Sequence, residues 1–435
     1  MEGSVAVRVD FIDDLRWRGL VYQTTDDARI GPWLAEKSRT LYAGFDPTAD
    51  SLHVGHLLGV LMLRRFQRAG HRPIALIGGA TGMVGDPSGK SQERPLLPEE
   101  VLQANVEAIR RQLERFLDFS PGSCSAVLVN NYEWMSRFGY LQFLREVGKH
   151  FPVNVMLSKD SVRIRLERPD AGLSYTEFSY MLLQAYDFVY LYQHYQCELQ
   201  IGGSDQWGNI TAGIDLGRRM LGVELWGLTW PLLTTSGGGK MGKTESGTIW
   251  LSPEKTSPYQ FYQYWINTAD EDVLKFILFF TEVSPEEFRQ LSEALEKDPS
   301  QRIPHRFLAT ELTRLVHGPE GLATAERATR FFFGEAIENV SDAELESIFG
   351  DVPSGELPRL TLEEPGLSVV DAVVACGLAK SKSEARRLIT QGGVYVNNRR
   401  VEDIERRLTA SDLASPSIMI LRTGKKNYGL LRFRG

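Results

Sequence analysis

The alternation of strand, loop, helix and strand between residues 40 and 77 constrains the fold more than any other feature of the sequence. A short apolar run, residues 40–44, is followed by a polar loop that contains Pro47. An apolar stretch with helical spacing covers residues 54–69, and a second apolar run, residues 72–77, leads directly into two glycines. This order is typical of a β-α-β unit, in which functional groups gather at the carboxyl ends of parallel strands. We therefore predict an α/β protein with a Rossmann-like parallel sheet.

Further domains follow the predicted sheet along the chain. The sheet domain is expected to span residues 1–235, with an inserted helical segment at about 130–200. Residues 236–335 combine a glycine-rich loop with apolar residues at helical spacing, which predicts an α-helical domain. Residues 336–366 are acidic and rich in Pro and Gly, and are interpreted as a linker or a small lobe. Residues 367–435 are predicted to form a small α+β domain with two helices and a hairpin around an Asn-Asn turn.

Charge is distributed unevenly between these domains. The 435 residues carry a formal net charge of −7, yet residues 367–435 contain 13 Lys and Arg against 6 Asp and Glu. A basic module on an acidic body is expected where only that module binds a polyanion, and a solvated basic surface is the alternative. No apolar run reaches the ~20 residues that a membrane span needs, and the three cysteines lie far apart. We expect a cytoplasmic protein without membrane association, a disulfide framework or a Cys-x-x-Cys metal site.

Two histidines, His53 and His56, lie where the first predicted loop meets the helix. The amides and the positive dipole end of a helix N-terminus favour anions, and the intervening Gly55 lets a phosphate approach the backbone. The pair is therefore suited to donating hydrogen bonds to phosphoryl oxygens. A structural or solvated pair is one alternative. A metal site is the other, although no third ligand stands nearby at zinc-type spacing.

A second candidate site is the segment Lys240-Met-Gly-Lys243-Thr244, which follows a glycine-rich run. Two lysines three residues apart on a loop that moves easily supply the positive charge that pyrophosphate requires in a transition state. An exposed linker is the alternative. The glycine-rich segment at 78–91 does not match the phosphate-binding pattern Gly-x-x-x-x-Gly-Lys, because Val84 stands where a glycine is needed.

Together these motifs carry a resemblance to a known family. His53-Val-Gly-His56 resembles the HIGH signature of class I aminoacyl-tRNA synthetases, and Lys240-Met-Gly-Lys-Thr244 resembles their KMSKS signature. The segments at 41–53, 85–90, 175–180 and 200–209 are more specific and resemble bacterial-type tyrosyl-tRNA synthetases. The C-terminal residues resemble the αL RNA-binding motif that is shared with a ribosomal small-subunit protein. The departures from the two signatures are conservative, and both histidines and both lysines are retained.

The resemblance implies a two-step reaction with ATP as co-substrate. The carboxylate of L-tyrosine attacks the α-phosphate of ATP to give tyrosyl-adenylate and pyrophosphate, and the 3′ end of tRNA(Tyr) then accepts the tyrosyl group. Because a carboxylate is already a nucleophile, the enzyme's task is positioning and charge stabilisation. Mg²⁺ is expected with the ATP phosphates, without a dedicated protein metal site. The resemblance also implies a homodimer, formed by an apolar surface within residues 138–192.

The resemblance further implies roles for individual residues. The residues expected to be catalytic, through the phosphates and pyrophosphate, are Thr48, His53, His56, Lys90, Arg94, Lys240, Lys243 and Thr244. ATP, including its ribose, would also contact Gly44, Asp46, Gly55, Gly203, Asp205 and Lys243. Tyrosine would be bound at its phenol by Tyr42 and Asp187, at its ammonium group by Asp86, Tyr180 and Gln184, and near its carboxylate by Gln206. The residues expected to contact tRNA are Lys380, Lys382, Arg386 and Arg387.

One of these assignments has support from spacing alone. Tyr180, Gln184 and Asp187 lie at i, i+4 and i+7, so they share one face of a predicted helix. Two other functions stay open as alternatives. A synthetase for another amino acid, with tryptophan the nearest, would lack the Tyr42/Asp187 pair and the basic module. An inactive RNA-binding protein would show decayed signatures. ATP–pyrophosphate exchange with each amino acid distinguishes these three functions.

Overall fold

The computed structural model describes residues 10–88, 97–159, 162–163, 166, 172–238, 241–244, 247–350 and 352–435. The chain forms two compact units. The first comprises Met1–Ser252 and Thr268–Leu308, and the second comprises Pro253–Asn267 and Ala309–Gly435. Of the helices in the described part of the chain, none combines the length and the apolar character needed to cross a bilayer.

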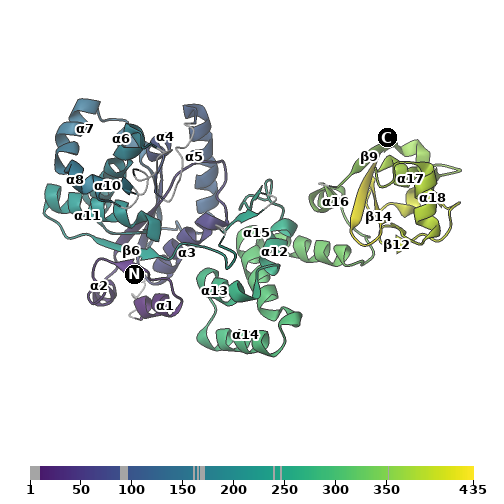
Figure 1. Ribbon diagram of the computed structural model, residues 1–435, viewed down its shortest axis with the longest axis horizontal. Helices are drawn as coiled ribbons and strands as arrows, with labels where there is room; N and C mark the ends of the chain where they lie inside the picture. Colours follow the sequence, from purple (N-terminus) through teal and green to yellow (C-terminus); the bar gives the residue numbers. More distant parts are fainter. Residues whose placement is uncertain are drawn as a thin grey trace. The chain divides into compact units, whose positions relative to one another are not determined.

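A six-stranded sheet in the order β1-β6-β5-β2-β3-β4 lies in the first unit (Figure 1). Its strands are β1 (Gln23–Thr24), β2 (Thr40–Phe45), β3 (Arg72–Ile77), β4 (Val127–Asn130), β5 (Cys197–Gly203) and β6 (Trp226–Trp230). Neighbouring strands run parallel, except that β1 pairs antiparallel with β6 at one edge. Strand order reverses between β2 and β5, and the carboxyl ends of strands at such a point are where doubly wound sheets bind ligands. The predicted parallel sheet is confirmed.

The predicted β-α-β unit consists of β2, α3 (Val54–Arg68) and β3. Ten of the fifteen residues of α3 are buried, most of them apolar, and the helix packs against both strands. Its buried cation Arg65 donates hydrogen bonds of 2.8 Å to the carbonyl oxygens of Phe279 and Thr281 at the end of α13 (Asp270–Phe280). These bonds satisfy carbonyls that a helix C-terminus leaves unpaired, and they fix α13 against α3.

The other α-helices described in the first unit are α1 (Phe11–Trp17), α2 (Ile30–Glu36), α4 (Thr81–Val84), α5 (Glu99–Leu113), α6 (Tyr132–Met135), α7 (Tyr140–Glu146), α8 (Val153–Leu157), α10 (Tyr175–Tyr195), α11 (Trp207–Leu221) and α14 (Pro285–Lys297). The long helix α10 begins where the Ser174 hydroxyl accepts a hydrogen bond from the amide of Glu177 at 3.2 Å. It ends at Gln196, which has a left-handed φ of 56°. Because α10 packs against α11 and β5, it places its polar residues beside the sheet.

The second unit contains a five-stranded sheet in the order β12-β11-β14-β15-β9. Its strands are β9 (Ser354–Pro358), β11 (Val394–Val396), β12 (Arg399–Arg400), β14 (Ile418–Thr423) and β15 (Asn427–Arg434). Its helices include α12 (Pro258–Ile266), α16 (Asp342–Phe349), α17 (Val369–Ala375) and α18 (Lys382–Thr390), and α15 (Ile303–Phe332) runs from the first unit into it. The hairpin predicted around the Asn-Asn turn is confirmed, since Asn397 and Asn398 have φ values of 47° and 65° between β11 and β12.

The structure differs from the expected linker at residues 336–366. Helix α16 buries Leu345 and Phe349 in the core of the second unit, and β9 pairs in parallel with β15. Arg432 of β15 also pairs with Glu346 of α16 at 2.5 and 2.6 Å. Because β9 is a half-exposed edge strand of mostly polar and small residues, it has no run of apolar residues that the sequence could reveal.

Candidate active site

Polar side chains from three strand ends and from α10 meet in one hydrogen-bonded network. Tyr180 on α10 donates to Asp46 Oδ2 at 3.1 Å, and Thr81, at the start of α4, donates to Asp46 Oδ1 at 2.8 Å. A Cβ atom at Gly78 would overlap both Asp46 and Thr81, so glycine is required where β3 ends. Burial, followed by the charge of Asp46, raises the pKa of Tyr180 well above its usual value, so the phenol stays a donor.

Asp187 on α10 is a buried carboxylate, with an exposed fraction of 1%. Trp134 Nε1 donates to its Oδ1 at 2.8 Å, and Asn131 Nδ2 donates to its Oδ2 at 3.0 Å. Asn131 also contacts Thr81 Oγ1 at 3.1 Å, which links this carboxylate to the Asp46 cluster. Burial raises the pKa of Asp187 to about 7, although both hydrogen bonds act in the opposite direction.

Two buried polar atoms on neighbouring strands of the sheet have no hydrogen-bond partner among the described residues. They are the hydroxyl of Tyr42 on β2 and Oε1 of Gln200 on β5. Tyr42 and Gln200 are register partners in the paired strands, so their side chains lie on the same face of the sheet. Burial, and then the charge of Asp187, raises the pKa of Tyr42 well above its usual value. Buried polar atoms are nearly always paired, so this arrangement points to a ligand with its own polar group.

A second cluster lies where β5 gives way to α11. Gln206 Nε2 donates to Asp86 Oδ2 at 2.7 Å, and Asn209 Nδ2 donates to Gln206 Oε1 at 3.1 Å. Asp86 Oδ1 also accepts a bond from the amide of Ser88 at 2.9 Å. The structure thus brings together Asp86 and Gln206, two residues that the resemblance assigned to the amino-acid substrate. Gln184 lies half-buried on α10, between Tyr180 and Asp187.

The two histidines form the N-terminus of α3. His53 is the N-cap, where its Nδ1 accepts from the amide of Gly55 at 3.0 Å. The amide of His53 donates to Nδ1 of His56 at 3.3 Å, and the rings stack with centroids 3.9 Å apart. Since Nδ1 accepts in both rings, each neutral imidazole carries its proton on Nε2. An N–H donor at the start of a helix is suited to an anionic ligand.

The segment after the second signature lies beside the first signature. The amide of Ile249 donates to Gly242 O at 2.9 Å, and the amide of Val54 donates to Ile249 O at 3.1 Å. Gly242 has a φ of 81°, and a Cβ atom there would overlap the side chain of Val54. Lys90, Arg94 and Lys240 lie outside the described residues, as do the side chains of Lys243 and Thr244.

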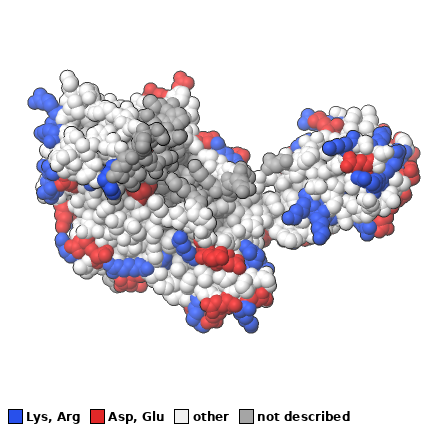
Figure 2. Space-filling model, viewed as in Figure 1, with Lys and Arg blue, Asp and Glu red and all other residues white. Residues whose placement is uncertain are grey.

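The remaining predicted residues fall on the surface or at strand ends. Thr48 and Gly44 are exposed, and Gly203 and Asp205 are half-buried at the carboxyl end of β5. The four predicted tRNA-binding cations, Lys380, Lys382, Arg386 and Arg387, are exposed on α18 or just before it, and we call them the basic face of α18. Figure 2 shows Lys and Arg side chains on the visible surface of the second unit, with acidic side chains among them.

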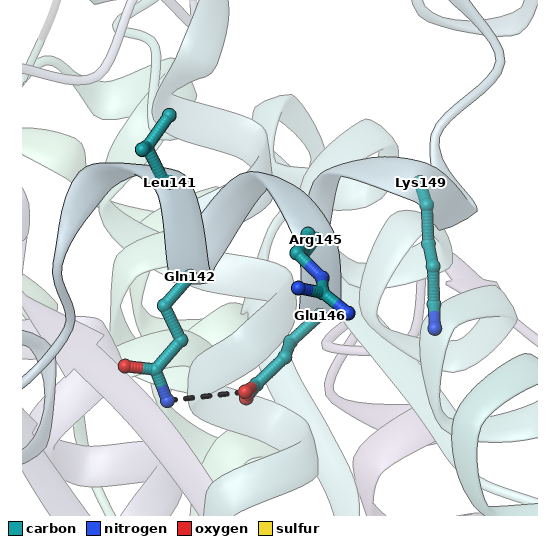
Figure 3. A pocket seen from close by; sticks show the side chains of 5 residues that line it. All are labelled: Leu141, Gln142, Arg145, Glu146 and Lys149. Atoms are coloured by element: carbon teal, nitrogen blue, oxygen red, sulfur yellow. Dashed lines mark hydrogen bonds between the residues drawn. The ribbon is translucent and has the colours of Figure 1, made fainter.

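A separate pocket lies along α7 and the turn after it (Figure 3). The side chains that line it are Leu141, Gln142, Arg145, Glu146 and Lys149, of which Gln142 donates to Glu146 at 3.0 Å. Of the predicted site residues that the structure describes, none lines it. Within the described ranges, no group of three or more His, Cys, Asp or Glu side chains is placed to hold a metal ion.

Sequence reasoning missed Thr81, Asn131, Trp134, Gln200 and Asn209, which complete the two clusters. Asn131 directly follows β4, so the general position of ligand-binding residues after parallel strands could have identified it. Trp134 has no such signal, because its role depends on the approach of Asp187 from a helix far along the chain.

Known proteins resemble this chain over nearly its whole length. The family model "tRNA synthetases class I (W and Y)" matches residues 34–334, and the model of the tyrosine–tRNA ligase C-terminal domain matches residues 344–431. The tyrosine–tRNA ligase of Rhodopirellula baltica is 57% identical over 423 residues, which are 97% of this chain and 96% of that protein. The ligase of Roseiflexus castenholzii is 54% identical over 421 residues, 97% of this chain and 99% of that protein.

A solved structure agrees with this match. The C-terminally truncated mitochondrial tyrosyl-tRNA synthetase of Aspergillus nidulans has a TM-score of 0.66 and 32% identity, covering 74% of this chain and 93% of that one. Sequence, family models and fold thus agree with one another. The chain belongs to the tyrosine–tRNA ligases, within the class I tRNA synthetases.

Proposed function

We propose that this member of the tyrosine–tRNA ligases joins L-tyrosine to tRNA(Tyr) in two steps at the carboxyl ends of its parallel strands. In the first step a tyrosine carboxylate oxygen bonds to the α-phosphorus of ATP, and the bond to the β-phosphate breaks to release pyrophosphate. In the second, a hydroxyl oxygen at the 3′ end of tRNA bonds to the tyrosyl carbonyl carbon, and AMP leaves with the bonding electrons. Neither step requires a protein nucleophile, so the rate enhancement comes from positioning the reactants and stabilising charge in the transition state.

The observation that carries the choice of tyrosine is the pair formed by Tyr42 and Asp187. A substrate phenol can donate its proton to the Asp187 carboxylate and accept one from the Tyr42 hydroxyl, which has no partner among the described residues. Phenylalanine would leave the Tyr42 hydroxyl unpaired, at a cost of about 1–3 kcal/mol for a buried group, and would offer Asp187 no donor beyond Trp134 and Asn131. Tyrosyl-tRNA synthetases prefer tyrosine to phenylalanine by a factor of about 10⁵, and we adopt that magnitude here.

The ammonium group of tyrosine needs acceptors, and the two clusters supply them. Because Tyr180 gives its proton to Asp46, the lone pairs on its oxygen remain to accept from an ammonium group. Asp86 offers carboxylate oxygens beside Gln206, whose amide would lie near the substrate carboxylate. Gln184, on the same helix face as Tyr180, would complete the ammonium site.

The phosphates of ATP would bind at the start of α3. The Nε2–H groups of His53 and His56 would donate to phosphoryl oxygens, together with Thr48 and the backbone at Gly44 and Gly55. Asp205 and Gly203 would hold the ribose, with Asp46 nearby. Lys90, Arg94, Lys240, Lys243 and Thr244 would bind pyrophosphate, a role supported by the resemblance. Mg²⁺ would reach the site bound to the ATP phosphates, where it would neutralise their charge.

We further infer that the protein is a homodimer. Large apolar side chains are exposed on α7, α8 and the segment up to the start of α10, namely Tyr140, Leu141, Val153, Val155, Leu157, Leu166 and Tyr175. They fall within residues 138–192, where the sequence placed an apolar interface, and monomers rarely expose such a group of side chains. A second copy of this chain fits this surface. Sedimentation velocity should show a dimer, and Leu141→Glu together with Val155→Glu should yield monomers. A monomeric wild-type protein would overturn the inference.

ATP–pyrophosphate exchange with tyrosine, tryptophan and phenylalanine tests the proposal as a whole. Exchange should depend on tyrosine, and charging should occur with tRNA(Tyr). Equal exchange with tryptophan would contradict the roles of Tyr42 and Asp187. Absence of exchange with every amino acid would contradict the catalytic roles and favour an RNA-binding protein. A cytoplasmic location remains a prediction from the sequence.

A further inference from the structure

A buried carboxylate from a distant part of the chain holds the segment that leads to the second signature. Asp272, in the first turn of α13, is 6% exposed. Its two oxygens accept from the amide of Ser236 at 3.1 and 2.9 Å, and Oδ2 also accepts from the Ser236 hydroxyl at 2.9 Å. Ser236 itself is exposed, so this carboxylate, and not burial, fixes the segment at that residue. Lys275, one turn further along α13, contacts Thr234 O at 3.4 Å.

The held residue belongs to a loop whose base is closed. The amide of Met241 donates to Leu233 O at 3.3 Å, and Gly242 is held in turn by Ile249 at 2.9 Å. Ser236 lies between these points and directly precedes a run of three glycines. Glycine loses more conformational freedom on ordering than any other residue, so a fixed residue directly before such a run lowers the entropy that ordering the segment costs. Ser236 precedes Lys240 by four residues, a span of about 14 Å at most.

The helix that carries Asp272 is itself fixed to the site. Arg65 of α3 donates to the carbonyl oxygens of Phe279 and Thr281, at the other end of α13. The helix that begins with His53 and His56 therefore supports the helix that holds Ser236. This connection joins the helix of the two histidines to Ser236 through α13.

We propose that Asp272 is a positioning residue for adenylate formation, because it holds Ser236 in the segment that leads from residue 233 to the second signature. This inference rests on the proposed role of Lys240 and Lys243 in binding pyrophosphate. The competing account is that Asp272 stabilises only its own helix, since Asp270, Glu271 and Asp272 all lie in the first turn. That account predicts that removing the negative charge of Glu271 or of Asp272 changes the rate of adenylate formation equally.

Single-turnover formation of tyrosyl-adenylate by the full-length protein separates the two accounts. Asp272→Asn replaces charge-assisted bonds by neutral ones and should lower the rate constant at saturating ATP about tenfold. The dissociation constant for tyrosine should not change. Ser236→Ala, at an exposed position, removes only the hydroxyl bond and should lower the rate constant about threefold. Glu271→Gln removes a charge from the same helix turn and should match the wild type.

Double variants identify the route of the effect. Asp272→Asn should add almost nothing to the loss caused by Lys243→Ala, because the anchor acts through the loop lysines. A Lys243→Ala variant with an unchanged rate would overturn the role of the lysines and this inference with it. A slow Lys243→Ala variant beside an unchanged Asp272→Asn variant would overturn the inference alone. An Asp272→Asn variant that does not fold would leave Ser236→Ala as the deciding measurement, and an unchanged rate there would contradict the proposal.

Discussion

The proposed tyrosine side of the site and its proposed phosphate side are built in different ways. Asp187 is buried and held by two donors on separate elements, and Tyr180 is fixed by Asp46. The phosphate side consists of two histidines at a half-exposed helix start and of a glycine-rich loop held by Asp272. A buried network chooses between substrates because unpaired polar groups are costly there. Histidine and lysine donors on the proposed phosphate side are suited to charge that develops during the reaction.

The largest effect should follow a change to the buried side. Asp187→Ala removes the acceptor for the substrate phenol, so selectivity for tyrosine over phenylalanine should fall from about 10⁵ towards about 10². Pyrophosphate exchange with both amino acids measures it. Glu133→Ala, which removes a carboxylate next to Trp134 in the sequence, should keep full selectivity. Unchanged selectivity in Asp187→Ala would contradict the assignment of the phenol site.

Changes on the phosphate side should affect the rate instead of the choice of substrate. Lys243→Ala and His53→Ala should each lower the rate constant of adenylate formation by about 10²–10³, as expected for the loss of one transition-state donor. The dissociation constant for ATP should change much less, because these contacts strengthen only as charge develops. Stopped-flow single-turnover kinetics measure both quantities. If either variant lost only ATP affinity and kept its rate constant, the proposed role of the phosphate side in the transition state would be contradicted.

The basic face of α18 should affect only the second step. Replacing Lys380, Lys382, Arg386 and Arg387 by Gln should raise the KM for tRNA by about ten- to a hundredfold and leave exchange unchanged. The salt dependence of tRNA binding should also become shallower, by about 0.7–0.9 for each phosphate that these cations neutralise. Matched replacements of Arg289 and Lys297 on α14 serve as the control. Normal charging by the four-residue variant would identify the basic face as a solvated surface.

Substitution is a better test here than deletion of the C-terminal residues. A chain cut after Gly350 would keep α16 but not β14 and β15, so Phe349 and Leu345 would be without much of the core that buries them. Any failure to charge tRNA would then mix misfolding with the removal of phosphate-binding cations.

The smallest predicted effect concerns pH. Burial raises the pKa of Asp187 to about 7, so its carboxylate takes up a proton as the pH falls through 7. The ionised form is the better acceptor for the phenol, and tyrosine affinity should therefore fall about tenfold between pH 8 and pH 6. ATP affinity should not follow this curve. Isothermal titration with tyrosine measures it, and Asp187→Asn should give a flat profile. A flat wild-type profile would place the pKa outside this range.

The same shift has a consequence for the unliganded protein. Between the ordinary pKa of an aspartate, near 4, and a folded pKa of about 7, the folded state binds more protons than the unfolded state. This group alone therefore makes the free energy of unfolding fall as the pH rises from 4 to 7. Bound tyrosine should oppose that trend at the upper end of the range.

The sequence by itself determined the parallel sheet and the places of the two signatures. Apolar runs at 40–44 and 72–77 predicted β2 and β3 because strands buried on both faces are continuously apolar. The histidine pair was recognisable because it lies between a polar loop and an apolar helical stretch that are adjacent in the sequence. The Asn-Asn turn was predictable for the same reason, since it depends on the φ preference of two adjacent residues.

Only the tertiary structure decided which side chains complete the site. Trp134 and Asn131 hold Asp187 through contacts across more than fifty positions in the chain. Asp272, on helix α13, holds Ser236 in the segment before the second signature. Apart from the position of Asn131 directly after β4, neither the spacing of these residues nor their type distinguishes them from ordinary surface or core positions. The edge strand β9 was hidden likewise, because its partner β15 lies far along the chain. Such contacts depend on the packing of the whole sheet and its helices, which no local pattern encodes.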